Sequence, residues 1–222
     1  MTNTLHRYGD AESFNDDYII FAIPCKGKND EGAVEKLKLF LGICAKHKPV
    51  NIGNSSFASY RPSTELEPSV HWKRKQVAEP QSVIEGVHRS ATAAAVFDSI
   101  DKTEACLRDL INADLGLSIN VSTSVEGAKR VAADCGIRRH SVEYSLGFDD
   151  PHDNLPDKQV LELSTMCGHG MVSANMAKKM LELVREGRRD PRAAAITLAR
   201  FCPCGAYNPA RAERLLRAGR SK

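Results

Sequence analysis

The chain has 222 residues, enough for one domain with a full core or for two small lobes. Hydrophobic residues make up 42% of it and charged residues 27%, a composition that indicates a globular protein and excludes a disordered one. Residues 1–17 are polar and mixed in charge, so we expect no secretory signal there, and no apolar run approaches the roughly 20 residues that span a bilayer. We therefore expect a cytoplasmic protein without a membrane segment.

The net charge of +3 is unevenly distributed along the chain. Residues 185–222 contain ten Arg or Lys residues and three acidic ones, so this segment carries +7 and the remainder carries −4. The basic residues are spread among alanines at helical spacing, which is typical of a solvated helical face or of attraction for an anionic substrate. The pattern argues against nucleic-acid binding and favours a small-molecule substrate, and it leaves the oligomeric state open.

The first part of the chain predicts a sheet with a helix packed on it. After a polar lead-in at residues 1–16, the run 17–24 is typical of a buried strand ended by its proline. Apolar residues at a spacing of three and four predict a helix between Asp30 and Cys44, and residues 49–53 predict a short second strand. Residues 54–80 are rich in serine, proline and charge and predict a long loop.

A regular alternation of elements then runs to residue 146. We expect strands at 94–98, 117–122 and 140–146 and helices at 102–113 and 125–135. This β-α-β-α-β order predicts an α/β or α+β fold in which helices cover a sheet, with the strand directions left open. Tyr144 lies at the end of the last expected strand, where α/β folds commonly contact ligands, so it is a candidate substrate-binding residue.

From residue 156 onward the pattern predicts only helices. Four of them are expected, starting near Pro156, Val172, Asp190 and Asn208. We therefore divide the chain into an α/β sandwich domain at 17–150 and a helical subdomain at 151–222.

Seven cysteines, an odd number without an export signal, argue against a disulfide framework. Cys44, Cys106 and Cys135 fall in apolar helical patterns, so we expect buried, unreactive thiols at these positions. Cys25 lies between lysines after a strand, where a chance loop thiol and a low-pKa thiol are equally good interpretations.

The other three cysteines lie in two glycine-flanked motifs, Thr165-Met166-Cys167-Gly168-His169-Gly170-Met171 and Phe201-Cys202-Pro203-Cys204-Gly205-Ala206-Tyr207. Each motif precedes an expected helix. Glycine lets the backbone approach a ligand closely, and a helix N-terminus favours the thiolate. The helical subdomain therefore carries the candidate functional site.

Three convergent thiolates can hold a [4Fe-4S] cluster and leave one iron open to a substrate. Cys167, Cys202 and Cys204 are the expected ligands, and the open iron would polarise a small anionic metabolite in a lyase or desulfurising reaction. Zinc also suits tetrahedral sulfur coordination, with His169 as a fourth ligand in a non-catalytic module. The Cys-x-Cys spacing is tighter than the Cys-x₂-Cys of structural zinc sites and ferredoxins, so metal-free thiol catalysis and structural thiols stay open as alternatives.

Met166-Cys167-Gly168-His169-Gly170 resembles the Met-Cys-Gly-His-Gly motif of the proline racemase family, and Pro203-Cys204-Gly205 resembles its Pro-Cys-Gly element. The resemblance implies a cofactor-independent racemase or epimerase in which Cys167 and Cys204 face each other across the substrate and exchange its α-proton. Amides of Gly168, Gly170 and Gly205 would then bind the substrate carboxylate, and His169 would be a further acid/base group. In this chain the two cysteines are only 37 positions apart, and Cys202 has no counterpart in the family pattern. The wider C-terminal segment is also similar to an uncharacterised prokaryotic family.

Overall fold

The structure is a computed structural model that describes residues 2–54, 79–145, 155–202 and 204–219. Most of the expected loop at 54–80, the end of the expected strand at 140–146, and Pro203 lie outside the described residues.

Four strands form one antiparallel sheet in the spatial order β2-β3-β1-β4. They are β1 (Tyr18–Ile23), β2 (Asn51–Asn54), β3 (Ala93–Phe97) and β4 (Ser118–Ser122). Helix α1 (Ala33–Lys46) connects β1 to β2, and α4 (Ile100–Ala113) connects β3 to β4. This connectivity is the split β-α-β arrangement of ferredoxin-like folds. The expected mixed α/β class is confirmed, and the strand directions that the sequence left open are antiparallel.

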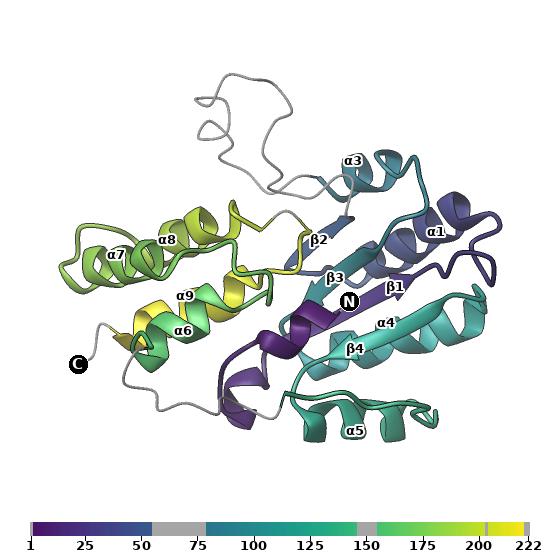
Figure 1. Ribbon diagram of the computed structural model, residues 1–222, viewed down its shortest axis with the longest axis horizontal. Helices are drawn as coiled ribbons and strands as arrows, with labels where there is room; N and C mark the ends of the chain where they lie inside the picture. The colour runs from purple at the N-terminus through teal and green to yellow at the C-terminus, as the bar shows by residue number, and fades with distance from the viewer. Residues whose placement is uncertain (1, 55–78, 146–154, 203, 220–222) are drawn as a thin grey trace.

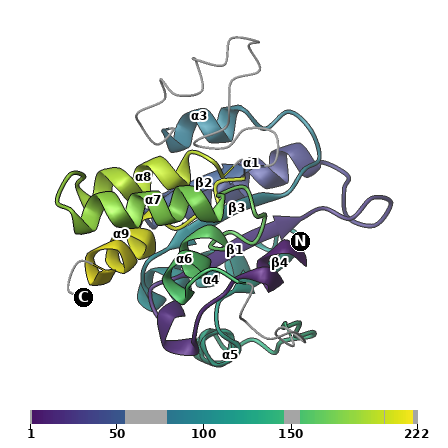
Figure 2. The same cartoon turned by 60° about the vertical axis from the view of Figure 1, so that its left-hand side comes forward.

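Both faces of the sheet are covered, because successive strand residues point to opposite sides. Ile20 and Phe97 pack with α1, with α4 and with α3 (Pro80–Glu85), a short helix that the sequence did not predict. Ile19, Phe21 and Val96 point to the other side and share a core with the C-terminal helices. Figures 1 and 2 show the two sets of helices on opposite sides of the strands. Burial on both faces explains why β1 and β3 are almost continuously apolar.

The four expected C-terminal helices form close to their predicted positions. They are α6 (Lys158–Ser164), α7 (Ala174–Arg185), α8 (Pro191–Ala199) and α9 (Pro209–Ala218). Side chains of Ser173, Asp190 and Asn208 accept hydrogen bonds from backbone amides in the first turns of α7, α8 and α9. No helix within the described ranges is long and apolar enough to cross a membrane.

The expected third strand of the alternating region does not form. After α5 (Val125–Asp134), residues 140–145 belong to neither a helix nor a strand, and Val142 and Tyr144 are 47% and 62% exposed. An alternating run becomes a stable strand when packing buries one of its faces, and here the apolar face stays largely exposed at Val142 and Tyr144. The prediction was therefore wrong for 140–145, and Tyr144 loses the strand-end position that made it a candidate substrate contact.

The N-terminal residues are packed into the structure. Two 3₁₀ turns, η1 (Thr2–His6) and η2 (Ala11–Phe14), precede β1, and the side chains of Arg7 and Phe14 are buried. Arg7 is buried although it is charged, because it pairs with Asp17 inside the protein. The segment that we expected to be a polar lead-in therefore contributes buried side chains to the fold.

A buried charge network centred on Asp17 ties this segment to α9. The Asp17 carboxylate accepts hydrogen bonds from Arg7, from Arg211 at 2.9 Å and from the Asn208 amide at 3.0 Å. The ring of Phe14 lies 4.8 Å from the guanidinium carbon of Arg7 and 4.2 Å from that of Arg211. Cation–π contacts of this kind, out of water, add to the ion pairs.

Replacing Asp17 with asparagine should lower the free energy of unfolding by about 3–5 kcal/mol, because two buried arginines lose their shared counter-charge. The matched control is Asp16→Asn. Asp16 pairs with Arg214, whose side chain is 46% exposed, so this change should cost about 1 kcal/mol or less. Urea unfolding followed by circular dichroism measures both, and similar losses for the two variants would contradict the assigned role of Asp17.

Candidate functional site

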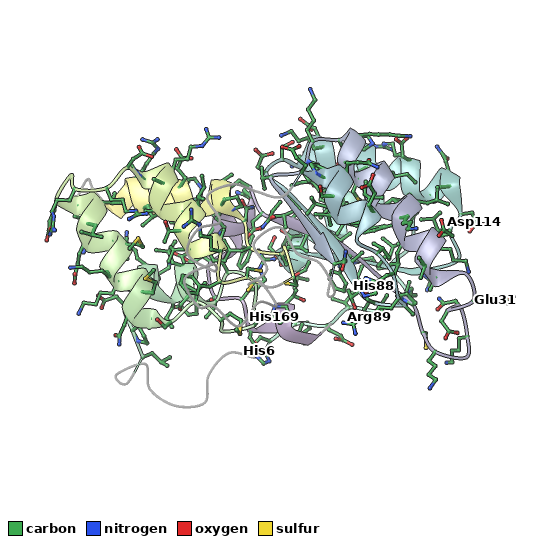
Figure 3. The ribbon with its side chains drawn as sticks, turned by 90° about the horizontal axis from the view of Figure 1, so that it is seen from above. His6, Glu31, His88, Arg89, Asp114 and His169 are labelled. Carbon is green, nitrogen blue, oxygen red and sulfur yellow. The ribbon has the colours of Figure 1, made fainter. Side chains whose placement is uncertain are left out.

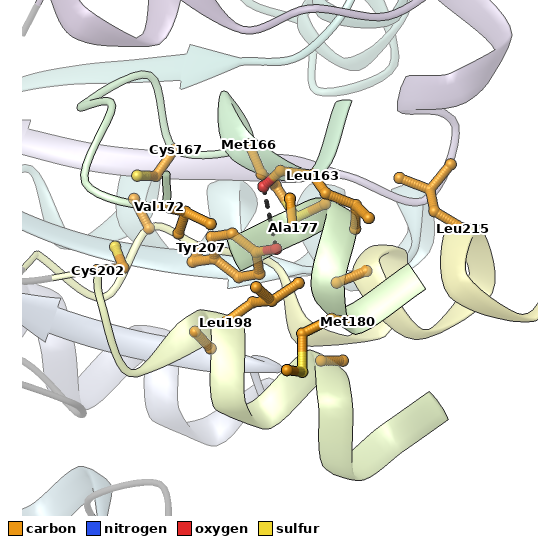
Figure 4. Packing of buried hydrophobic residues seen from close by; sticks show 14 of the residues in the cluster. Leu163, Met166, Cys167, Val172, Ala177, Met180, Leu198, Cys202, Tyr207 and Leu215 are labelled. Carbon is orange, nitrogen blue, oxygen red and sulfur yellow. Dashed lines mark hydrogen bonds between the residues drawn. The ribbon is translucent and has the colours of Figure 1, made fainter. Parts of the chain in front are cut away.

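The structure brings the three C-terminal cysteines together at two junctions between helices. Cys167 follows α6, and Cys202 and Cys204 follow α8. The Sγ atoms of Cys202 and Cys204 are 3.5 Å apart, Cys167 forms a hydrogen bond with Cys202, and Sγ of Cys204 lies 3.5 Å from Nδ1 of His169. The side chains of Cys167 and Cys202 lie together at one end of the core cluster in Figure 4. Each of the four side chains expected at the site therefore contacts at least one of the others.

The cysteines are deeply buried, whereas the histidine is not. Cys167 and Cys202 are fully buried and Cys204 is 8% exposed, while His169 is half-buried. Figure 3 shows His169 among the labelled side chains of the molecule. Three of the four donors are thus fixed by core packing, and the fourth lies on the turn between α6 and α7.

Every cysteine of the site accepts a hydrogen bond from the backbone amide two residues further along the chain. The donors are the amides of His169 to Cys167, of Cys204 and Tyr207 to Cys202, and of Ala206 to Cys204. Amide donors stabilise negative charge on sulfur and tune metal–thiolate sites. These amide hydrogen bonds favour thiolates at the three cysteines although their side chains are buried.

Two of the cysteines are followed by a glycine in the left-handed backbone conformation. Gly168 and Gly205, each directly after a cysteine, have φ of 77° and 73°. Residues with a side chain rarely adopt this conformation. The amide of Gly168 donates to the carbonyl of Thr165 at 2.8 Å, so it does not point at a substrate carboxylate as the racemase resemblance implied.

The loop with Cys202 and Cys204 rests directly on the edge strand β2. A Cβ added at Gly53 would lie 2.6 Å from the carbonyl oxygen of Cys204, and one added at Gly205 would lie 2.7 Å from the Gly53 amide nitrogen. Asn51 also donates to the carbonyl oxygen of Tyr207 at 2.8 Å. Sequence reasoning missed Asn51 and Gly53, and the available signal was a glycine inside a strand, which often marks a close backbone approach.

Tyr207 connects this loop to α6 from inside the core. Its buried hydroxyl donates to the carbonyl oxygen of Leu163 at 3.1 Å, which Figure 4 shows as a dashed line. Because Leu163 lies four residues before Cys167, this bond fixes the two cysteine motifs relative to each other.

Cys202 is the central sulfur of the group. Hydrogen bonds from the Cys167 and Cys204 thiols, together with the backbone amides, hold the pKa of Cys202 well below its usual range despite its burial. Hydrogen bonding to Cys202 is also the main reason why the pKa values of Cys167 and Cys204 are raised, with burial second. The three cysteines therefore favour the thiolate form at the central position.

The donors touch in series, from Cys167 to Cys202 to Cys204 to His169. Within the described residues, no three or more His, Cys, Asp or Glu side chains form a group that could hold a metal ion as they stand. Two of the spacings, 3.5 Å between the Sγ atoms of Cys202 and Cys204 and 3.5 Å between Sγ of Cys204 and Nδ1 of His169, are nevertheless close to the edges of a tetrahedral site. Metal–ligand bonds of about 2.3 Å for sulfur and 2.0 Å for nitrogen give edges of about 3.8 and 3.5 Å. A [4Fe-4S] cluster places each thiolate on a different iron, so it requires these sulfurs to separate.

The arrangement differs from what two-base racemisation requires. In that mechanism Cys167 and Cys204 face each other across a substrate-sized gap, with Cys202 turned away. Here Cys202 contacts both of them. Two hollows in the described part of the chain lie elsewhere, one between α6 and α7 and the other between α4 and β4, and no cysteine lines either of these two.

The remaining cysteines lie apart from the site. Cys44 on α1 and Cys106 on α4 are fully buried with their Sγ atoms 3.7 Å apart, Cys135 is half-buried, and Cys25 is exposed. The expectation of buried thiols is confirmed for Cys44 and Cys106.

Comparison with protein-family models, with curated proteins and with solved structures gives no match for this chain. The interpretation of the site therefore depends on its own geometry.

Replacing Gly53 with alanine should lower the free energy of unfolding by about 1–3 kcal/mol, because the new methyl group meets the backbone of the cysteine loop. Gly42→Ala is the control. Gly42 lies in α1 with open space around the Cβ position, so alanine should stabilise the protein by about 0.5–1 kcal/mol. Denaturant unfolding of both variants tests the contact, and a neutral Gly53→Ala would contradict it.

Tyr207 should make the fold sensitive to alkali. Burial raises the pKa of its phenol well above the usual value, so the folded state keeps a proton that the unfolded state loses above about pH 10, and stability falls as pH rises from there. Tyr207→Phe should cost about 1 kcal/mol at neutral pH through the lost hydrogen bond but remove this part of the alkaline loss. The two stability curves should converge above pH 10; parallel curves would contradict the assignment.

Proposed function

We propose that the protein is a metal–thiolate protein in which Cys167, Cys202, Cys204 and His169 bind one tetrahedral ion of the zinc class. The observation that carries the proposal is the convergence of three buried thiols, each with an amide donor, with a histidine nitrogen at a tetrahedral edge distance. Because the donors lie in series, side-chain rotations must bring them around the ion. Four protein ligands make a closed site, which stabilises a fold without performing chemistry.

Such an ion would join the two turns that follow α6 and α8. These turns are 35 residues apart between Cys167 and Cys202, and the contacts between them include thiols that are protonated without metal. Metal binding would release these protons and replace weak S–H hydrogen bonds with coordinate bonds. The proposed role is therefore to hold the C-terminal helices on the sheet.

A second candidate is the iron–sulfur enzyme that the sequence suggests, with a [4Fe-4S] cluster on the same three cysteines and a small anionic metabolite at the open iron. One observation favours it. The three cysteines are fixed in the core, whereas His169 is half-buried on a turn between two glycines, so the fourth position is the one that can open. The cluster form would require the two turns to move apart.

The test is metal analysis of anaerobically purified protein, followed by cobalt titration of the metal-free form. We expect one zinc-class ion per chain and, with cobalt, the sulfur-to-metal charge-transfer and intense d–d bands of a tetrahedral thiolate site. Brown protein with iron and labile sulfide would support the cluster instead. Protein that binds neither metal after reconstitution would reject both forms and leave the thiols as packing groups.

Serine variants identify the ligands. Cys202→Ser and Cys204→Ser should reduce metal content and thermal stability together, because binding free energy contributes to folding. Cys25→Ser, at an exposed loop position, is the matched control and should change neither. Full metal content in both ligand variants would contradict the assignment.

A further inference from the structure

Arg7 reaches the turn that carries Cys167 from the opposite end of the chain. Its Nε donates to the carbonyl oxygen of Met166 at 2.9 Å, and its side chain is only 2% exposed. The same guanidinium donates to the Ser122 carbonyl and hydroxyl oxygens, at 3.2 and 3.3 Å, and pairs with Asp17. One buried cation thus joins β4, β1 and the residue before Cys167.

The neighbouring residue makes a second contact with the same turn. The amide of Tyr8 donates to the hydroxyl of Thr165 at 2.9 Å. Residues 7 and 8 therefore hold residues 165 and 166 from a segment more than 150 positions away. Figure 3 shows His6, the residue before Arg7, on the same side of the molecule as His169, in agreement with these contacts.

The positive charge of Arg7 also interacts electrostatically with Cys167. In a dry interior such a charge stabilises the negative charge of a nearby thiolate ligand.

We propose that Arg7 is a positioning residue of the metal site, which fixes the Cys167 turn through Met166 and Thr165 and favours metal binding through its positive charge. This inference rests on the proposed metal site. Groups outside the ligand shell commonly change metal affinity by about 10–100-fold, which sets the effect to look for.

The experiment measures cobalt affinity of the full chain by competition with a chelator, together with the cobalt spectrum. Arg7→Gln should bind cobalt about 10–100-fold more weakly, because the positive charge is lost. Arg7→Lys should recover much of the affinity, since it keeps the charge, which a purely structural role would not predict.

Arg214→Gln is the matched control. Arg214 also ties the N-terminal segment to α9, through Asp16 and the Ser13 carbonyl oxygen, and its hydrogen bonds do not involve the described residues of the cysteine turns. Its affinity should equal that of the unmodified chain. Equal weakening in Arg214→Gln and Arg7→Gln would overturn the inference, because general loosening of the segment would then explain both.

The outcomes separate the two proposals. If the unmodified chain binds no cobalt, the proposed function fails and this inference falls with it. If it binds cobalt and Arg7→Gln binds equally well, only the inference is overturned. If Arg7→Gln does not fold, Thr165→Val is the deciding variant, because it removes the acceptor of the Tyr8 amide and keeps every charge. A smaller loss of cobalt affinity in Thr165→Val supports the positioning role. Unchanged cobalt affinity overturns it.

Discussion

The Asp17 carboxylate is the point on which the geometry of the cysteine site depends. It pairs with Arg7, whose Nε holds Met166 directly before Cys167, and it accepts from Asn208, which follows Tyr207 at the end of the other motif. One buried anion at the start of β1 therefore fixes both cysteine turns relative to the sheet. A buried ion pair of this kind costs desolvation, so its contribution here is to specify one arrangement of three distant segments.

The sheet edge supplies the second constraint on the site. At β2 the backbone of Gly53 lies directly against that of Gly205, a spacing that only residues without a Cβ permit. The hydrogen bond from Asn51 then sets how far along the strand the loop lies. The cysteine loop is thus held by backbone packing on one side and by the charge network on the other.

The sequence predicted the elements whose signals are local. The helix caps at Ser173, Asp190 and Asn208 and the apolar strands β1 and β3 were readable because periodicity and capping chemistry involve neighbouring residues. The run at 140–145 was misread because its alternation is real but its apolar residues Val142 and Tyr144 remain exposed. The burial of Arg7 and Asp17 could not be read either, since it depends on Met166 and Arg211, which lie 159 and 194 positions away from them.

In the site too, local features could be predicted from the sequence and features that depend on distant residues could not. Motif composition was enough to expect Cys167, Cys202, Cys204 and His169 in one place, because glycine-flanked cysteines before helices point to a common chemistry. Which sulfur lies in the middle depends on how the two turns pack. The position matters because hydrogen bonds from the thiols on either side lower the pKa of the central Cys202. That order also weighs against opposed acid/base cysteines, which need an empty space where Cys202 now lies.

The unequal burial of the four donors limits how the proposed centre could work. The cysteines lie in the core and are fixed by amide donors, so exchanging any of them would disturb packing on β2 or α6. The side chain of His169 is less restrained, because it is only half-buried and lies on a turn between two glycines with positive φ, although its backbone amide donates to Cys167. If a substrate or a second ligand reaches the metal, it must therefore do so by replacing His169, and the side of the molecule that carries the α6–α7 turn is where it would enter. For a single zinc-class ion, a closed four-ligand site and an open three-cysteine site would then differ by the position of the His169 side chain.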